Sequence, residues 1–468
     1  MLSLQAIERR ALERTSLFAC LGNPYLLVYG LFLLTMVSLS FAIPGVHSVA
    51  MSARWPVLGF TAVVGLAATI FMGHRTWSGA HKALALFLAA VGLSATYSLD
   101  PEYSIQRGIS ICLLFTATLV GLYSYCRTWK HAIIATDLLW GFGALLVVVG
   151  FVFRASAGAT GARYEGLHSR ATGAGTYAAL FLPIAVYQAS YRLNGLMKGF
   201  GWCVVLLMLA QTFLAGARMA ALTGLFLAIA LGYAYNAKRA TLALIALLFL
   251  APVPFIVEPK NVDKLVEKSE RLVRAESFGT FTGRLDRWMF GVEQWLKKPA
   301  LGNGFGASRT LAGQEDPRRF KLQPGETFNL HSDQIEVLMD VGVVGYMPFA
   351  AFWGLLLYFG WKTIRSPRTI HRQMSLAYLG SLFYAFADTF MHGGFLAAGG
   401  GVSAFSWSMI ALFLATRPTA LRIPMPMPAP AATRKRPVRE DVEFGPPVEA
   451  PTAALPSARS FARPTVGF

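Results

Sequence analysis

Long apolar runs, separated by short polar or basic segments, dominate the chain. A helix needs about 20 mainly apolar residues to cross a bilayer. The spans of a membrane β-barrel would instead show short alternations of apolar and polar positions. The continuous runs therefore predict an all-α, polytopic membrane protein with about 12 transmembrane helices. The expected spans are 25–43, 56–72, 83–98, 108–124, 133–153, 173–190, 200–216, 219–236, 240–257, 342–361, 374–391 and 400–416.

Composition supports the membrane class and excludes an ordinary soluble enzyme. The 468 residues are 55% hydrophobic and only 14% charged, whereas a soluble domain carries about 25% charged residues. Residues 1–24 are polar and basic, and the apolar run after them is long enough to span the membrane. This arrangement favours an uncleaved first helix over a removable signal peptide.

The distribution of Lys and Arg between short loops predicts the orientation. With a cytoplasmic N-terminus, the short cytoplasmic segments hold 15 of these residues and the opposite short loops hold six. An even number of spans then returns the C-terminus to the cytoplasm. The net charge of +18 is largely explained as a topology signal, so no nucleic-acid partner is expected.

The expected domain organisation follows from these spans. Two segments outside the bilayer are long, one on the outer, periplasmic side and one at the C-terminal end. The parts are a cytoplasmic N-terminus (1–24), transmembrane helices 1–9 (25–257), a large periplasmic loop (258–341), transmembrane helices 10–12 (342–416) and a disordered, Pro- and Arg-rich cytoplasmic tail (417–468).

The large loop carries structural signals of its own. Apolar residues recur at helical spacing from Thr282 to Lys297, which predicts an amphipathic helix. The glycine-rich segment 302–306 is interpreted as a flexible turn. A new helix is expected near Asp333, where Asp333 and Glu336 resemble a capping box. His331 then lies just before that helix, at the mouth of the tenth span.

Motifs for metals and nucleotides are missing from the sequence. The four cysteines fall in the spans or on the cytoplasmic side, and no pair among the eight histidines has metal-ligand spacing. No Gly-Lys-Ser/Thr phosphate loop is present. Neither a metal nor a cofactor is therefore expected.

Several arginines and one histidine gather at the expected outer membrane surface. Guanidinium groups bind phosphate oxygens in bidentate fashion and stay charged at any working pH. A neutral histidine can take a proton from a hydroxyl group. These residues favour transfer of a group from a lipid-linked diphosphate, although an interfacial arginine can also merely extend its head group towards water. The residues are Arg107, Arg163, Arg218, Arg284, Arg287 and His331.

Segments in the same part of the chain resemble the O-antigen ligase and O-antigen polymerase superfamily. The resemblance covers most of residues 90–350 and depends on the order of the pieces as well as on their content. The pieces are Tyr97–Ser104 with Arg107, Arg163–Gly166 and the residues that follow through Pro183, Arg218–Leu222, Thr282–Trp288, Pro299–Gly304, His331 with Glu336–Leu338, and Gly342–Gly345.

The resemblance implies a metal-independent, integral-membrane glycosyltransferase of the bacterial inner membrane, with its active site facing the periplasm. Such enzymes take a glycan from undecaprenyl diphosphate. A ligase places it on a sugar of the lipid A core, and a polymerase places it on another lipid-linked repeat. By this resemblance His331, Arg218 and Arg284 would be catalytic, and Arg163, Arg107 and Arg287 would bind substrate.

Two alternatives remain open at this point. An O-antigen or exopolysaccharide polymerase is nearly as well supported as a ligase, because both share the same loop signature. A transporter or flippase of lipid-linked glycans would also suit twelve spans, but such proteins more often show inverted repeats with interrupted helices at the membrane midplane.

Overall fold

The computed structural model describes residues 22–72, 76–157, 167–168, 171–193, 195–235, 279–314, 328–366 and 370–417. All of them belong to the unit Met1–Leu421, whereas the unit Arg422–Phe468 lies outside the described residues. The expected span 240–257 and most of the expected C-terminal tail also lie outside them.

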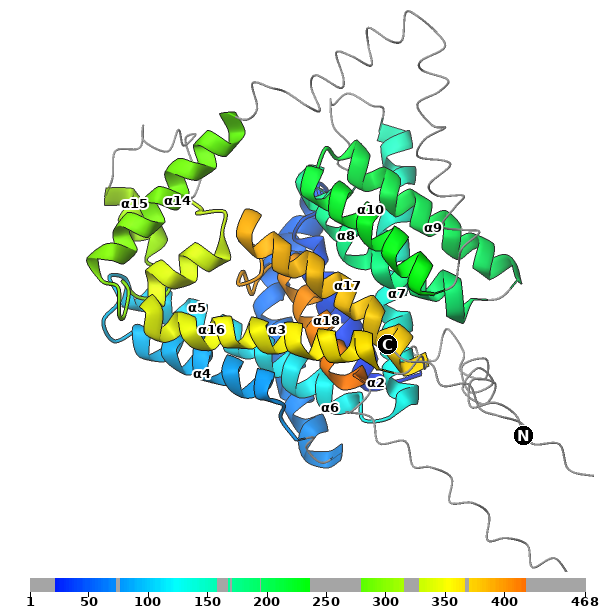
Figure 1. Cartoon of the computed structure of the whole chain (residues 1–468), viewed down its shortest axis with the longest axis horizontal. Helices are drawn as coiled ribbons and strands as arrows, with labels where there is room; N and C mark the ends of the chain where they lie inside the picture. Colours follow the sequence, from blue (N-terminus) through cyan, green and yellow to red (C-terminus); the bar gives the residue numbers. More distant parts are fainter. Residues whose placement is uncertain are drawn as a thin grey trace, which may run out of the picture. The chain divides into compact units, whose positions relative to one another are not determined.

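The described part of the chain is all-α, as the apolar runs predict (Figure 1). The other eleven expected spans each overlap helical structure, and their bounds differ most at Pro44–Met72 and Asp333–Arg365, which begin 12 and 9 residues before the expected starts at 56 and 342. Two π-helical segments, η1 and η2, continue α5 and α8. The helices are α2 (Pro24–Ser38), α3 (Pro44–Met72), α4 (Gly79–Ser94), α5 (Pro101–Phe115), η1 (Thr116–Leu122), α6 (Tyr123–Tyr125), α7 (Trp129–Ala157), α8 (Ala171–Tyr187), η2 (Gln188–Arg192), α9 (Gly195–Leu214), α10 (Arg218–Ala234), α14 (Gly279–Lys297), α15 (Ser308–Gln314), α16 (Asp333–Arg365), α17 (Ile370–Met391) and α18 (Gly401–Thr416).

Five helical stretches are long and apolar enough to cross a membrane, which makes the chain an integral membrane protein. Shorter apolar helices accompany them, and the count of twelve spans stays a prediction. The five are Gly45–Phe71, Pro101–Tyr125, Trp129–Phe153, Gly195–Leu214 and Asp333–Arg365.

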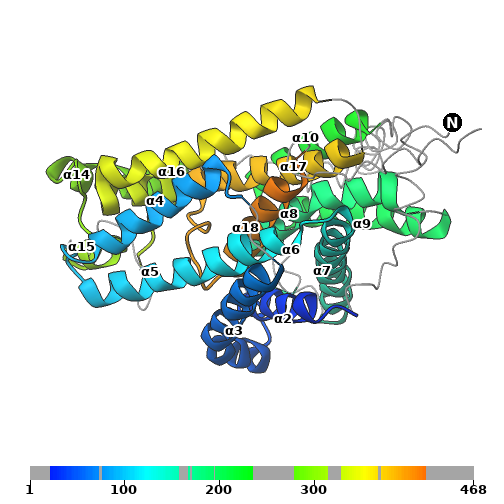
Figure 2. The ribbon, with the colours of Figure 1, turned by 90° about the horizontal axis from the view of Figure 1, so that it is seen from below.

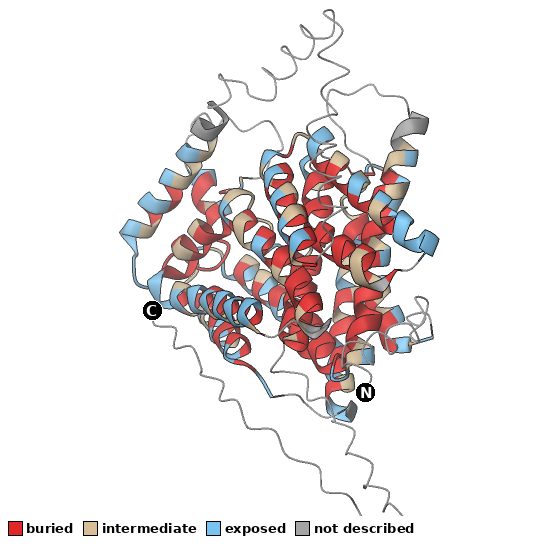
Figure 3. Cartoon of the chain, turned by 45° about the vertical axis from the view of Figure 1, so that its right-hand side comes forward, coloured by how far each residue is buried: buried red, intermediate tan, exposed pale blue. Residues whose placement is uncertain are grey.

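Helix α18 forms the centre of the core. All of its residues except Val402 are buried (Figure 3). It packs against α17, α2 and η1, while α8 packs against α9, α10 and α17. A helix that is apolar on every side is expected inside a bundle, and α18 occupies such a place.

Helices α4, α5 and α16 run side by side, and α14 and α15 lie at their common end (Figure 2). Helix α16 makes its most extensive contact with α4. The amphipathic helix of the large loop is thus α14, as its apolar spacing predicts. It is held against the start of α16 and not separated from the bundle.

The start of α16 corrects one expectation. The helix begins at Asp333, but its N-cap is Ser332, whose hydroxyl accepts a hydrogen bond from the Ile335 amide at 3.4 Å. The expected capping box of Asp333 and Glu336 is therefore wrong. The buried Asp333 carboxylate instead accepts hydrogen bonds from the amides of Phe395 and Leu396, in the segment between α17 and α18.

Candidate functional site

Helix α14 brings two of the expected arginines to the start of α16. Its apolar face buries Phe290 in a small cluster with Leu330 and Met339, outside the main core. Burial of such a stripe fixes the rotation of an amphipathic helix. Arg284 and Arg287 lie on the same helix, about two turns and one turn before Phe290 respectively.

Arg287 contacts His331 directly. Its Nη1 donates hydrogen bonds to Nε2 of His331 at 3.0 Å and to the carbonyl oxygen of Asn329 at 3.0 Å. An arginine always carries its protons, so Nε2 is the acceptor in this contact. This hydrogen bond requires an imidazole that carries its proton on Nδ1 and not on Nε2.

The backbone holds His331 in an unusual conformation. Its φ is +55°, the only positive φ among the described non-glycine residues. The side-chain oxygen of Asn329 accepts a hydrogen bond from the His331 amide at 2.7 Å. Residues kept in this sparsely populated region often lie at functional sites, where the surrounding structure compensates for the strain.

Arg284 is partly buried and interacts with Asp388, a carboxylate that is paired with a second histidine, His392. Burial lowers the pKa of its guanidinium, the Asp388 carboxylate raises it, and Arg287 lowers it. Asp388 accepts a hydrogen bond from Nδ1 of His392 at 2.7 Å. Arg284 remains a cation at any working pH, and it interacts with both Arg287 and the Asp388 carboxylate.

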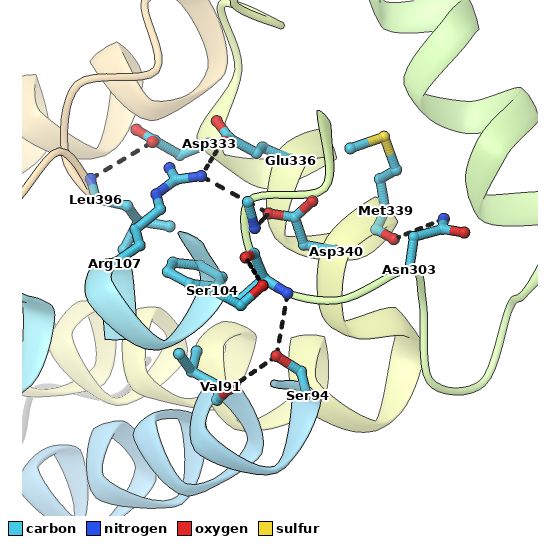
Figure 4. A network of polar contacts seen from close by, with 12 residues as sticks. Val91, Ser94, Ser104, Arg107, Asn303, Asp333, Glu336, Met339, Asp340 and Leu396 are labelled. Carbon is cyan, nitrogen blue, oxygen red and sulfur yellow. Dashed lines mark hydrogen bonds and ion pairs between the residues drawn. The ribbon is translucent and has the colours of Figure 1, made fainter. Parts of the chain in front are cut away.

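Arg107 forms a buried network with two carboxylates of α16 (Figure 4). Its Nη1 lies 2.6 Å from Oε1 of Glu336 and 3.9 Å from Oδ2 of Asp340. The guanidinium also lies over the Phe305 ring, 4.6 Å from its centroid. Asp340 is fully buried and accepts a hydrogen bond from the Gly306 amide at 2.6 Å. The network joins α5, the turn 302–306 and α16.

The turn 302–306 is therefore anchored and not the flexible turn that its glycines suggest. The Phe305 amide donates to Oγ of Ser94 at 3.1 Å, and its carbonyl accepts from Oγ of Ser104 at 2.7 Å. Gly304 has a φ of +100° and lies against Ser98, where a Cβ would collide with that residue. The glycines here permit close approach of backbone to α4 and α5.

A cavity of about 590 Å³ adjoins both the contact between Arg287 and His331 and the network around Arg107. Phe328 and Asn329 form one wall, and the same two residues contact Arg287, through the face of the Phe328 ring and the Asn329 carbonyl. Arg107 and Glu336 form another wall. The full lining is Arg54, Trp55, Tyr103, Gln106, Arg107, Ser110, Ser308, Arg309, Phe328, Asn329, Glu336, Gly393, Leu396, Ala397, Ala398, Gly399 and Gly400.

The structure brings together four of the six expected site residues. His331, Arg284 and Arg287 form one cluster, and Arg107 lies in the neighbouring network. Arg218 begins α10 and is exposed, on a helix that packs mainly against α8, α9 and α17. Arg163 lies outside the described residues.

Sequence reasoning missed Asp340, Asp388 as a neighbour of Arg284, and the cavity residues Arg54 and Arg309. An available signal for Arg54 is its position beside Trp55, directly before an apolar run. Asp340 offers no such signal, because its partner Arg107 is distant in the chain.

Within the described residues, no cluster of three metal-ligating side chains occurs. Asp100 caps α5, and its carboxylate accepts a hydrogen bond from the Tyr103 amide.

Comparison with known proteins gives one match. None of the curated proteins matches the chain. A family model described as O-antigen ligase matches residues 203–350, which include Arg218, Arg284, Arg287 and His331. The match confirms the resemblance and implies a membrane glycosyltransferase of the O-antigen ligase or polymerase type. Residues 203–350 are therefore similar to an O-antigen ligase family domain.

Proposed function

We propose that this protein is an O-antigen ligase-like glycosyltransferase. It moves a glycan from undecaprenyl diphosphate to a sugar of the lipid A core at the periplasmic face of a bacterial inner membrane. The contact between Arg287 and His331 supports the proposal, because a guanidinium can bind phosphate and an imidazole beside it can act as a base. The O-antigen ligase match over the same residues supports it.

Arg284 and Arg287 bind the diphosphate in this proposal. Negative charge accumulates on the leaving diphosphate as the glycosidic bond breaks, and preorganised cations stabilise such charge most strongly in the transition state. Arginine suits this role because its planar guanidinium binds two phosphate oxygens at once. Arg218 is proposed as a third cation, and Arg163 and Arg107 as further substrate contacts.

His331 acts as the general base. In the free protein its Nε2 is occupied by Arg287. When the diphosphate engages Arg287, Nε2 becomes free to accept the proton of the acceptor hydroxyl. The acceptor oxygen then bonds to the anomeric carbon, the bond from that carbon to the diphosphate oxygen breaks, and undecaprenyl diphosphate leaves with the electron pair.

The test uses the purified full-length protein in nanodiscs, with an undecaprenyl-diphosphate-linked glycan and a lipid A core acceptor. Arg284→Gln, Arg287→Gln and His331→Ala should each lower the rate of transfer by about 100-fold or more, the scale of lost charge stabilisation or proton transfer. Arg365→Gln is the matched control, since Arg365 lies at the other end of α16. Wild-type rates in all three site variants would contradict the site assignment.

A strain without this gene separates ligase from polymerase. A ligase predicts uncapped lipid A core together with long glycans on undecaprenyl diphosphate. Single repeats where long chains should be, or loss of a secreted polymer with intact lipopolysaccharide, would indicate a polymerase instead. Glycans retained on the cytoplasmic face would indicate a transporter and overturn the proposal.

A further inference from the structure

The cavity beside His331 carries two cations that the reaction above does not use. Arg54 of α3 and Arg309 of α15 both line it. No ion pair joins either of them to a carboxylate within the described ranges. Glu336, the carboxylate in the lining, is already paired with Arg107. The cavity therefore presents uncompensated positive charge.

Arg54 is held in place from one side. Its guanidinium lies 4.8 Å from the centroid of the Trp55 ring. Its Nε is buried and has no hydrogen-bond partner in the described part of the chain. Nη1 lies beside Gly399, where an added Cβ would be 3.4 Å away. A buried donor without a partner costs free energy unless a ligand supplies the acceptor.

The rest of the lining suits a sugar. Gln106, Asn329 and Ser308 offer amides and a hydroxyl, which can donate and accept hydrogen bonds with sugar hydroxyls. Trp55 is 39% exposed, so part of its ring is available for contact with a ligand. Small residues from Ala397 to Gly400 also line the cavity, next to Arg54 and Trp55 at Gly399, and they leave room for a sugar ring.

The cavity lies at the depth expected of a membrane surface. Helix α3 has 29 residues, or about 43 Å at 1.5 Å per residue, against a hydrocarbon thickness of about 30 Å. The expected span 56–72 begins directly after Trp55, which predicts that Arg54 and Trp55 lie near one boundary of the hydrocarbon, within the longer apolar stretch Gly45–Phe71. The glycan of a membrane-bound donor, and an acceptor glycan beside it, are expected at this boundary between hydrocarbon and water.

We propose that this cavity binds an anionic sugar residue of the acceptor glycan, one that carries phosphate or carboxylate. Arg54 and Arg309 bind the anion, and the Trp55 ring lies against the sugar. The acceptor is favoured over the donor because Asn329 forms the wall of the cavity and also holds the amide of His331, the base that takes the acceptor proton. Only the assignment of this sugar to the acceptor rests on the proposed function.

Binding is tested without any transfer reaction. Saturation-transfer NMR on the full-length protein in nanodiscs compares glucuronic acid and glucose 6-phosphate with neutral glucose, and the affinity of inorganic phosphate, which has no proton signal, is measured by its competition with glucose 6-phosphate. The two anionic sugars should bind more tightly than glucose and inorganic phosphate. Arg54→Gln and Arg309→Gln should each weaken anionic-sugar binding by about tenfold, the scale of a lost charge-assisted hydrogen bond. Arg309 is exposed, so its variant should fold normally.

Arg365→Gln is the matched control for these variants. Arg365 lies over a tryptophan ring, as Arg54 does, but at the distant end of α16. Its loss should leave binding unchanged. Equal binding of glucose and the anionic sugars, or unchanged anionic-sugar binding in both cavity variants, would overturn the proposal. Inorganic phosphate binding as tightly as glucose 6-phosphate would reduce the cavity to a simple anion site and also overturn it.

Separate KM values for the acceptor and the donor then identify which of the two substrates the cavity binds. In the transfer assay, Arg54→Gln and Arg309→Gln should raise KM for the acceptor and leave KM for the donor unchanged. A rise for the donor alone would overturn the acceptor assignment. If anionic sugars bind as expected and the wild type transfers no glycan, the proposed function fails and the sugar site stands. Normal transfer with unchanged binding in the variants would sink the sugar site alone.

Discussion

At the scale of single residues, Arg107 shows how one side chain can hold separate segments together. It reaches Glu336 and Asp340 on α16 and covers the Phe305 ring. Only 17% of its side chain is exposed, and none of the Asp340 side chain. Buried carboxylates are costly without a cation. Arg107 therefore stabilises the wall of the cavity whether or not it also contacts substrate.

Arg107→Met should lower the free energy of unfolding by about 3–5 kcal/mol, because it leaves two buried carboxylates without their cation. Thermal and denaturant unfolding of the purified protein measure the loss. The matched variant Arg309→Met, on an exposed residue of the same cavity, should change this free energy by less than about 0.5 kcal/mol. Equal stability of the two variants would refute a structural role for Arg107.

At the scale of elements, glycines decide how the loop meets the bundle. Gly342 breaks α16 internally, with a φ of +62° and a ψ of −169°. The break coincides with the expected end of the large loop at residue 341. Gly304 lets the turn 302–306 pack against Ser98. Both positions need the left-handed region that glycine adopts without strain.

Gly304→Ala should destabilise the protein by about 1–3 kcal/mol and lower transfer, since the added Cβ brings backbone strain and a collision with Ser98. Unfolding and transfer rates report both effects. Gly313→Ala is the natural control. Gly313 is helical in α15, and a Cβ there would meet nothing within 4 Å. If the two alanine variants behave alike, the turn is not anchored as described.

At the scale of the whole molecule, the proposed reaction requires that the cluster around His331 face the periplasm. The Lys and Arg distribution predicts that α14 faces the periplasm and that the end of α16 near Arg365 faces the cytoplasm. Helix α16, with 33 residues, is long enough to cover that distance.

Cysteine labelling checks this orientation in a variant without native cysteines. Met289→Cys, on the exposed face of α14, should react with a membrane-impermeant maleimide once the outer membrane is permeabilised. Arg365→Cys should react only after the inner membrane is broken. The reverse pattern would place His331 in the cytoplasm and exclude the proposed reaction.

Local patterns in the sequence determined much of this protein. Apolar runs define the membrane helices, and a 3.6-residue spacing defines α14, because burial of a helix face is a property of the helix itself. The grouping of Arg284, Arg287 and His331 followed from resemblance to a family, and the match over residues 203–350 includes all three.

Only the tertiary structure decided which distant groups meet. Arg107 pairs with Glu336 across 229 positions of sequence, and no periodicity encodes such a contact. The cap of α16, the anchored turn 302–306 and the cavity with Arg54 and Arg309 also depend on how whole helices pack. Packing brings these polar groups together because a buried charge or amide must find its partner wherever the fold supplies one.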